Sequence, residues 1–248
     1  MHRHCVSTEE LLKDRMILDR AGSRHFFNVL RLRSGDAVTL FDGKGSSALF
    51  QIAKEATPSS AVLERVGEVR LQSPPLCHLI LAACISKGSR MDWTIEKAVE
   101  LGVSEVVPIL SRNSVVRISD PADAEDKRCR WERVATDAAR QCGSDFIPKI
   151  TLPQSFDKAL ARLSETSRIY AGALTDDAVL LRDALARDRN KARPQSVTWM
   201  VGPEGDFSPD ELEALRSANA NLISLGKLVL RTETAAVYGL CVFGSEWL

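Results

Sequence analysis

The sequence predicts an α/β protein in which a mainly parallel sheet carries helices on both faces, preceded by a small module of short strands. From residue 76 onward, apolar strand-like runs alternate with segments of helical spacing. Before that point, short strand-like segments are separated by turns rich in Gly, Pro and Ser. Between the two parts, Gln72-Ser73-Pro74-Pro75 cannot continue a sheet ladder, which places the domains at 1–72 and 73–248.

Composition excludes several broad classes. With 248 residues, 44% hydrophobic and 27% charged, the chain is neither disordered nor collagen-like. No apolar run reaches the ~18 residues of a membrane-spanning helix, and charged residues at 9–15 replace the apolar core of a signal peptide. Six cysteines without a C-x-x-C pair argue against a zinc ribbon or a disulfide framework. We therefore predict a cytoplasmic protein with no membrane partner and no metal. The formal net charge is zero, so no overall basic field attracts nucleic acid.

The first part of the chain predicts one short helix among strands. We expect its polar first residues to be frayed or to face RNA, and a helix over 23–33 with Phe26, Phe27 and Leu30 on its apolar side. The expected strands that follow cover 37–41, 47–53 and 61–71. The turn Asp42-Gly43 ends the first of these ranges, and the last range makes one or two strands. Short strands of this kind form a small barrel or sandwich.

The second part predicts alternating strands and helices. The expected strands cover 76–86, 103–110, 168–174, 196–201 and 221–225, and the expected helices cover 91–101, 121–142, 176–189, 209–219 and 232–248. Asp120 before Pro121 is typical of a helix start. Ser208 and Glu211 have the spacing of a capping box. Ligands of such folds bind beyond the carboxyl ends of the strands.

Three glycine-containing loops follow predicted strands. They span 172–175, 202–206 and 226–234, and glycine there lets a ligand approach the backbone. Neither G-x-x-x-x-G-K-[ST] nor G-x-G-x-x-G is present, which disfavours a nucleotide triphosphate or a dinucleotide. A cofactor held by backbone contacts fits better. Arg231 and Glu233 stand at the start of the last predicted helix, without an evident packing role.

Ordered motifs along the chain carry a family resemblance. They are Gly202-Pro203-Glu204-Gly205, Ser208-x-x-Glu211 and Leu225-Gly226-x-x-Val229-Leu230-Arg231-Thr232-Glu233-Thr234-Ala235, with His25-x-x-x-Val29-Leu30-Arg31 and Lys87-Gly88-x-Arg90 before them. With these motifs the chain resembles the bacterial ribosomal RNA small subunit methyltransferase E family of the SPOUT superfamily. The resemblance implies a PUA-like RNA-binding β-barrel over 1–72 and a SPOUT methyltransferase domain with a trefoil knot over 73–248. It also implies a homodimer.

The resemblance further implies the activity and the residues that carry it. The expected reaction is S-adenosyl-L-methionine-dependent methylation of N3 of a uridine in 16S ribosomal RNA, within the small ribosomal subunit. The expected cofactor-binding residues are Leu174, Val201, Gly202, Pro203, Glu204, Gly205, Leu225, Gly226, Leu228 and Leu230. The expected RNA contacts are Arg3, His25, Arg31, Lys87 and Arg90. As catalytic residues, Arg231 would steady the developing charge on the base or orient it, and Glu233 would accept a proton or position Arg231.

Departures and alternatives remain open at this point. Asp206 stands where the family has a second glycine, and Ser144 stands where it often has arginine. Arg231 and Glu233 have a structural alternative, an ion pair or a helix cap. The chain as a whole has functional alternatives: a non-catalytic PUA-type RNA-binding protein, a methyltransferase for another RNA, or a small-molecule methyltransferase.

Overall fold

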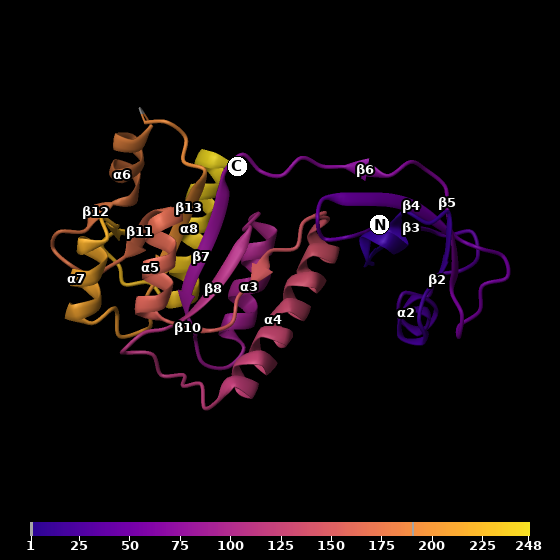
Figure 1. Cartoon of the computed structure of the whole chain (residues 1–248), viewed down its shortest axis with the longest axis horizontal. Coiled ribbons are helices and arrows are strands. Elements are labelled where there is room, and N and C mark those ends of the chain that lie inside the picture. Colours follow the sequence, from indigo (N-terminus) through magenta and orange to yellow (C-terminus); the bar gives the residue numbers. More distant parts are fainter. Residues whose placement is uncertain (1, 190) are drawn as a thin grey trace. The chain divides into compact units, whose positions relative to one another are not determined.

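The computed structural model describes residues 2–189 and 191–248, which form two compact units (Figure 1). The first unit contains the residues up to Pro74 together with Ala139–Ile147. The second contains Pro75–Ala138 and Pro148–Leu248. The linker at 72–75 correctly separates most of the two units, but nothing in it predicts that residues 139–147 belong to the first one.

A mixed sheet and three short helical segments form the first unit. The strands are β1 (His2–Cys5), β2 (Arg15–Ile17), β3 (Ala37–Phe41), β4 (Ser46–Ile52), β5 (Val62–Arg65) and β6 (Arg70–Leu71), and the helical segments are α1 (Thr8–Leu11), α2 (Arg20–Arg24) and the π-helix η1 (His25–Val29). The strand order is β1-β3-β4-β5-β2, with β6 on β4. Strand β1 runs parallel to β3, and the other pairs are antiparallel. Phe26, Leu40 and Phe50 are fully buried in its core.

Most strands of this unit agree with the prediction, whereas the first residues of the chain do not. Strand 37–41 is confirmed, and 61–71 divides into two strands. The prediction of a frayed start is wrong, because residues 2–5 pair with β3 in a register that sets Cys5 beside Phe41, whereas contact of these residues with RNA stays a prediction. This pairing is non-local, so no local pattern announces it. The helix expected over 23–33 instead covers 20–29. It ends before Arg31, whose φ of 56° is not helical.

Residues 139–147 are attached to the first unit through β1, β4 and the turn before β4. Arg3 forms an ion pair with Asp145 and donates a hydrogen bond of 3.0 Å to the carbonyl of Ser144. The Ser47 hydroxyl donates to Asp145 at 2.7 Å. The Arg3 guanidinium lies 4.7 Å from the centre of the Phe41 ring. These contacts leave the Arg3 side chain only 13% exposed.

His4 makes the stability of the protein depend on pH. Burial lowers its pKa to about 4, and the charges of Arg140 and His25 act in the same direction, against Asp19 and Glu10. Between pH 4 and 6.5 the unfolded chain therefore binds more protons here than the folded protein does. The resulting stability is fully present above pH 6.5 and is lost as pH falls toward 4. We expect this loss to contribute about 3 kcal/mol, measured as a shallower pH dependence of urea unfolding in His4→Gln. Identical slopes in both proteins would exclude His4 as the cause.

The second unit is built on a parallel sheet. Its strands are β7 (His78–Cys84), β8 (Glu105–Leu110), β9 (Lys149–Ile150), β10 (Gln154–Ser155), β11 (Arg168–Gly172), β12 (Val179–Leu180), β13 (Ser196–Val201) and β14 (Asn221–Ser224). Its helices are α3 (Arg90–Glu100), α4 (Pro121–Cys142, whose last residues belong to the first unit), α5 (Phe156–Thr166), α6 (Leu181–Asp188), α7 (Pro209–Ser217) and α8 (Thr232–Trp247). The order is β10-β8-β7-β13-β11-β14-β12, with β9 on β8.

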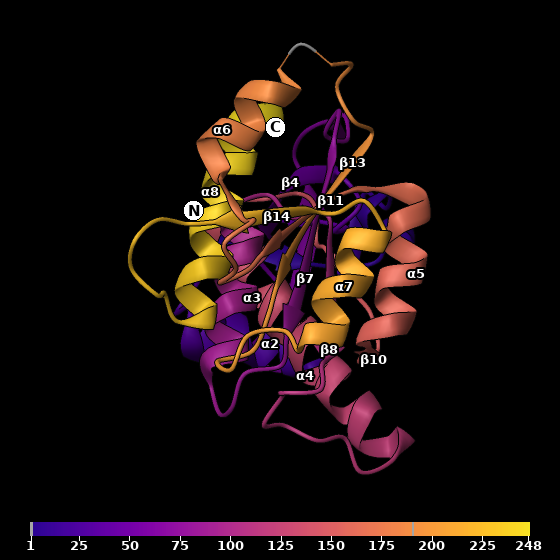
Figure 2. The same ribbon diagram turned by 90° about the vertical axis from the view of Figure 1, so that its left-hand side faces the viewer.

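Helices cover both faces of this sheet, as predicted. Helix α8 packs on β7, β13 and α3, whereas α5 packs on β8 and β11 and α7 packs on β14. In Figure 2, α3 and α8 lie on one side of the strands and α5 and α7 on the other. Strand β7 is buried almost throughout, as expected for the middle of a covered parallel sheet. Within the described residues, no helix is long and apolar enough to cross a membrane.

The strongest local signals are confirmed in the second unit, and several segments differ, among them the short strands β9, β10 and β12, which were not predicted. Helix α4 spans 121–142, and Ser208 and Glu211 form the capping box of α7. The helix expected over 176–189 begins only at Leu181, because residues 179–180 pair with β14. Helix α5 was not predicted, although Ser155 caps it and its buried side chains have helical spacing.

Candidate functional site

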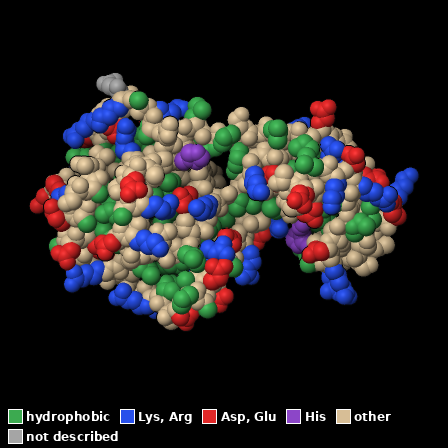
Figure 3. All heavy atoms as spheres, in the orientation of Figure 1, with side chains coloured by type: hydrophobic (Ala, Val, Ile, Leu, Met, Phe, Trp, Pro, Cys, Tyr) green, Lys and Arg blue, Asp and Glu red, His purple; other side chains and the backbone are tan. Residues whose placement is uncertain are grey.

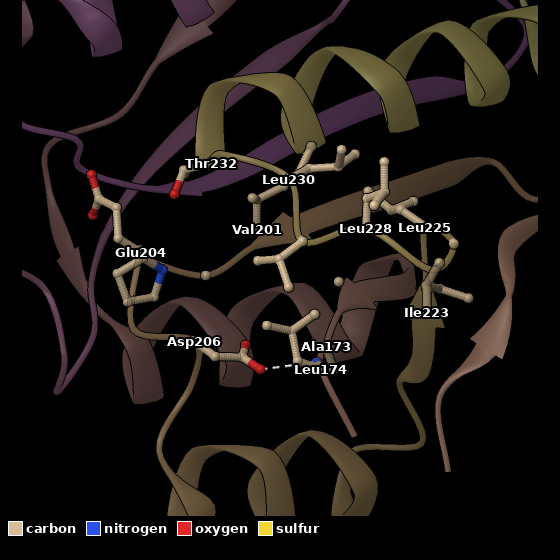
Figure 4. Close-up of a pocket in the computed structure, with 16 residues that line it drawn as sticks. Ala173, Leu174, Val201, Glu204, Asp206, Ile223, Leu225, Leu228, Leu230 and Thr232 are labelled. Carbon is tan, nitrogen blue, oxygen red and sulfur yellow. Dashed lines mark hydrogen bonds between the residues drawn. The ribbon is translucent and has the colours of Figure 1, made fainter. Parts of the chain in front are cut away.

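The carboxyl ends of three neighbouring strands surround one hollow. Loops after β11, β13 and β14, with the first turn of α8, surround a hollow that is partly open to solvent (Figure 4). A hollow at the carboxyl ends of parallel strands is where folds of this class bind their ligands. Of the residues predicted to bind a cofactor, those that line it are Leu174, Val201, Gly202, Pro203, Glu204, Leu225, Gly226, Leu228 and Leu230.

One predicted residue is absent from the lining, and several lining residues were not predicted. A Cβ added at Gly205 would face Asn113, at 3.5 Å, and Gly205 is not among the residues that line the hollow. The lining residues that were not predicted to bind the cofactor are Gly172, Ala173, Asp206, Ile223, Val229, Thr232 and Ala235. All of them except Ile223 belong to the glycine-containing loops or to the family motif, so those segments as a whole carried the signal that could have found them.

The backbone of the loop before α8 requires glycine at one position. Gly226 has a φ of 124°, which other residues rarely adopt, and nothing lies within 4 Å of where its Cβ would be. Large apolar side chains around the hollow remain exposed: Leu174 is 64%, Leu228 79% and Val229 74% exposed. Apolar side chains left open beside a hollow are typical of a surface that a ligand or a partner covers.

The charges that line the hollow are negative. Glu204 and Asp206 are the charged residues in the lining, as far as the described residues go. Glu204 forms an ion pair of 2.9 Å with Arg90, so its charge is compensated. Asp206 instead accepts hydrogen bonds from the backbone N–H groups of Leu174 and Phe207, at 2.9 and 2.8 Å. The site therefore suits a ligand that is apolar in part and carries positive charge rather than phosphate.

Arg231 and Glu233 flank a residue of the hollow. Thr232 lines it, and Arg231 is the residue before α8. In the described part of the chain, Arg231 is exposed, and its side chain makes no hydrogen bond or ion pair and does not cap α8. Glu233 Oε2 is buried and lacks a hydrogen-bond partner. Within residues 2–189 and 191–248, the structure thus forms neither the ion pair nor the cap that the structural alternative requires.

The residues predicted to contact RNA lie in different surroundings. Arg31 and Lys87 are exposed, and His25 is half-buried at the start of η1. Arg90 is paired with Glu204 at the hollow. Arg3 is committed to Asp145 and mostly buried, so its geometry points to a structural role instead of the expected RNA contact.

The surface charge is mixed. On the face seen in Figure 3, Lys and Arg side chains are interspersed with Asp and Glu. Among the described residues, no cluster of His, Cys, Asp or Glu could hold a metal ion.

Comparison with protein families defines the class. A model described as RNA methyltransferase domain matches residues 72–243, which include the whole hollow. A model described as RNA methyltransferase PUA domain matches residues 18–64 in the first unit. These matches define an RNA methyltransferase with a PUA domain.

Relatives identify the family. Ribosomal RNA small subunit methyltransferase E of Mycobacterium bovis is 31% identical over 93% of this chain and 87% of its own length. Its counterpart from Bacillus subtilis is 29% identical over 87% and 84%. The chain belongs to the ribosomal RNA small subunit methyltransferase E family.

Solved structures agree with this assignment. The Neisseria gonorrhoeae enzyme of the same name, bound to S-adenosyl methionine, has a TM-score of 0.85 and 28% identity, covering 100% of this chain and 98% of its own. A protein described as a methyltransferase from Legionella pneumophila, also in complex with this cofactor, has a TM-score of 0.86 and 27% identity, covering 98% and 96%.

Proposed function

We propose that the protein transfers a methyl group from S-adenosyl-L-methionine to N3 of a uridine in 16S ribosomal RNA. Membership of the family makes it an S-adenosyl-L-methionine-dependent methyltransferase of small-subunit ribosomal RNA. The choice of N3 of uridine is the finer part of the proposal. The observation that carries the function is the hollow at the strand ends, with Arg231 and Glu233 beside it.

The residues of the hollow fit the cofactor. The apolar side chains of Leu225, Leu228 and Leu230 suit an adenine ring, and among the described residues no cation in the lining opposes the positive charges of the sulfonium and amino groups. Among the described residues, no lysine, arginine or histidine lines the hollow. The hollow therefore lacks the cations that would bind a phosphate group. When bound, the cofactor supplies a methyl group activated by its sulfonium charge.

Arg231 and Glu233 would act on the RNA base. The imide nitrogen of uridine attacks well only after it loses its proton, so a base and a cation beside it favour the reaction. Glu233 Oε2 lacks a hydrogen-bond partner, which leaves it able to accept that proton. Arg231 has no ion-pair partner among the described residues, so its charge is available to the base as negative charge develops.

The remaining architecture supports RNA as substrate. Arg31 and Lys87 are exposed cations that can contact phosphate, and the PUA domain match lies in the first unit. We propose that the first sheet closes into a PUA-like barrel and that residues 225–231 enter a trefoil knot. The loops that meet at the hollow and the return of α8 onto β7 and β13 support the knot. A cytoplasmic homodimer acting on the small ribosomal subunit completes the proposal.

The test is transfer of labelled methyl to small ribosomal subunits that lack the modification, followed by mass spectrometry of the nucleosides. We expect labelled 3-methyluridine. A different methylated nucleoside would redirect the proposal to another base or RNA. Cofactor binding without transfer to any RNA would contradict it in favour of a small-molecule substrate, and RNA binding without cofactor binding would favour the non-catalytic alternative.

A further inference from the structure

Asp206 has a backbone conformation that is unfavourable for a residue with a side chain. Its φ is 58°, in the left-handed region that glycine adopts without steric cost. Among the described residues other than glycine, only Arg31 and Asn219 share a positive φ. Glycine would adopt this conformation without cost, and what it would lack are the hydrogen bonds of the Asp206 side chain.

The carboxylate of Asp206 joins two loops of the hollow. Oδ2 accepts a hydrogen bond of 2.9 Å from the N–H of Leu174, and Oδ1 accepts one of 2.8 Å from the N–H of Phe207. The dashed line in Figure 4 marks the first of these. Within residues 2–189 and 191–248, it is the only hydrogen bond between loop 173–175 and loop 202–206.

A residue of a third loop, Asn113, binds the backbone at Asp206. The side-chain amide of Asn113, which follows β8, donates to the carbonyl oxygens of Gly205 and Asp206 at 3.2 and 3.0 Å. The N–H of Asp206 itself donates to the carbonyl of Pro203 at 3.0 Å. Hydrogen bonds therefore hold the backbone and both carboxylate oxygens of Asp206. The contacts with Asn113, Pro203 and Phe207 fix the position of the carboxylate that binds the N–H of Leu174.

We infer that Asp206 is a positioning residue that holds the Leu174 loop against the Gly202–Asp206 loop and thereby shapes the cofactor site. Leu174 lines the hollow and is 64% exposed, so little packing holds it in place. A charge-assisted hydrogen bond to its N–H supplies the missing restraint. Prior ordering of the loop lowers the entropy lost when the cofactor binds. This inference rests on the proposed cofactor.

Two substitutions separate the contributions of Asp206. Asp206→Gly relieves the backbone but removes both hydrogen bonds. Asp206→Asn replaces one of the two acceptor oxygens with an NH2 donor, so that one of the two N–H groups loses its acceptor. Asn219→Gly is the matched control, because Asn219 has a φ of 56° just beyond α7 and does not line the hollow.

The experiment combines calorimetric titration with S-adenosyl-L-methionine, hydrogen exchange of the Leu174 amide in the free protein, and thermal unfolding. We expect Asp206→Gly to weaken binding at least ~10-fold by disordering the loop and to accelerate Leu174 exchange, with Asp206→Asn in between. Asp206→Gly should melt within about 3 °C of the parent, because strain relief offsets the lost bonds, and Asp206→Asn should do so because it loses only one of the two hydrogen bonds. Asn219→Gly should match the parent in affinity and Leu174 exchange. In turnover, KM for the cofactor should rise while kcat at saturation changes less than about twofold.

Unchanged affinity and unchanged Leu174 exchange in Asp206→Gly would overturn the inference. The inference would also be overturned if Asp206→Gly lowered both kcat and the melting temperature well beyond the limits expected above, because such a result indicates general disruption of the fold. If Asp206→Gly does not fold, Asp206→Asn decides by the same measurements. If the parent protein binds no cofactor, the proposed function fails, while Leu174 exchange still tests the contact itself.

Discussion

An Arg231→Ala variant is expected to lose about 10²–10³-fold in kcat, the usual effect of removing one group that stabilises developing charge. Arg231 is the residue before α8, and its guanidinium makes no hydrogen bond or ion pair within the described residues. Because folding does not use that charge, its removal should leave the melting temperature almost unchanged. The cofactor dissociation constant should change less than about threefold, since Arg231 does not line the hollow. Single-turnover methyl transfer to the ribosomal subunit measures the effect.

Arg182→Ala is the matched control for this variant. Arg182 is an arginine on α6 whose side chain is 81% exposed. Its replacement removes the same charge from the protein without approaching the hollow, so turnover should equal that of the parent. Full activity in Arg231→Ala would remove Arg231 from the mechanism, whatever the result for Glu233.

A Gly239→Ala substitution should destabilise the second unit by about 3 kcal/mol, the upper part of the usual range for overpacking. A Cβ at Gly239 would lie 2.5 Å from Nε1 of Trp199. Trp199 is fully buried in β13 and donates a hydrogen bond of 3.1 Å to the carbonyl of Ala235, so its ring cannot retreat. At about 2–4 °C per kcal/mol, the melting temperature should fall by about 6–12 °C.

The same helix offers the control. A Cβ at Gly244 would meet its nearest atoms, in Leu101 and Leu248, at an ordinary 3.7 Å. Gly244→Ala should therefore stabilise α8 by up to about 1 kcal/mol through helix propensity. If both variants melt at the same temperature, the close packing of α8 on Trp199 is not what limits residue size at position 239.

Local signals explain which elements could be predicted from the sequence. Asp120, Pro121 and Gly143 mark the ends of α4, and Ser208 and Glu211 mark the start of α7, because each acts on the backbone a few residues away. Strands β1 and β12 depend on partners far along the chain, and nothing in their own few residues reveals the pairing.

The candidate site divides in the same way. Glycine-containing loops after buried strands identified most of the lining, because parallel strands bring their carboxyl ends together. The ion pair of Arg90 with Glu204 and the contact of Asp206 with Leu174 join side chains from different loops. The burial of Arg3 likewise depends on Asp145, which lies 142 residues away. Such contacts depend on how the loops are arranged in space. The spacing of residues along the chain does not predict that arrangement.

The attachment of residues 139–147 has a consequence for synthesis and folding. Arg3 and Ser47 take their partner, Asp145, from a segment made 142 and 98 residues later, and the N–H of Ile147 donates to the carbonyl of Gly43. On the ribosome the first unit therefore cannot reach its final set of contacts until the chain beyond residue 147 has emerged. Long loop closures of this kind slow folding. Completion of the N-terminal unit is thus a late event, coupled to translation of the middle of the chain.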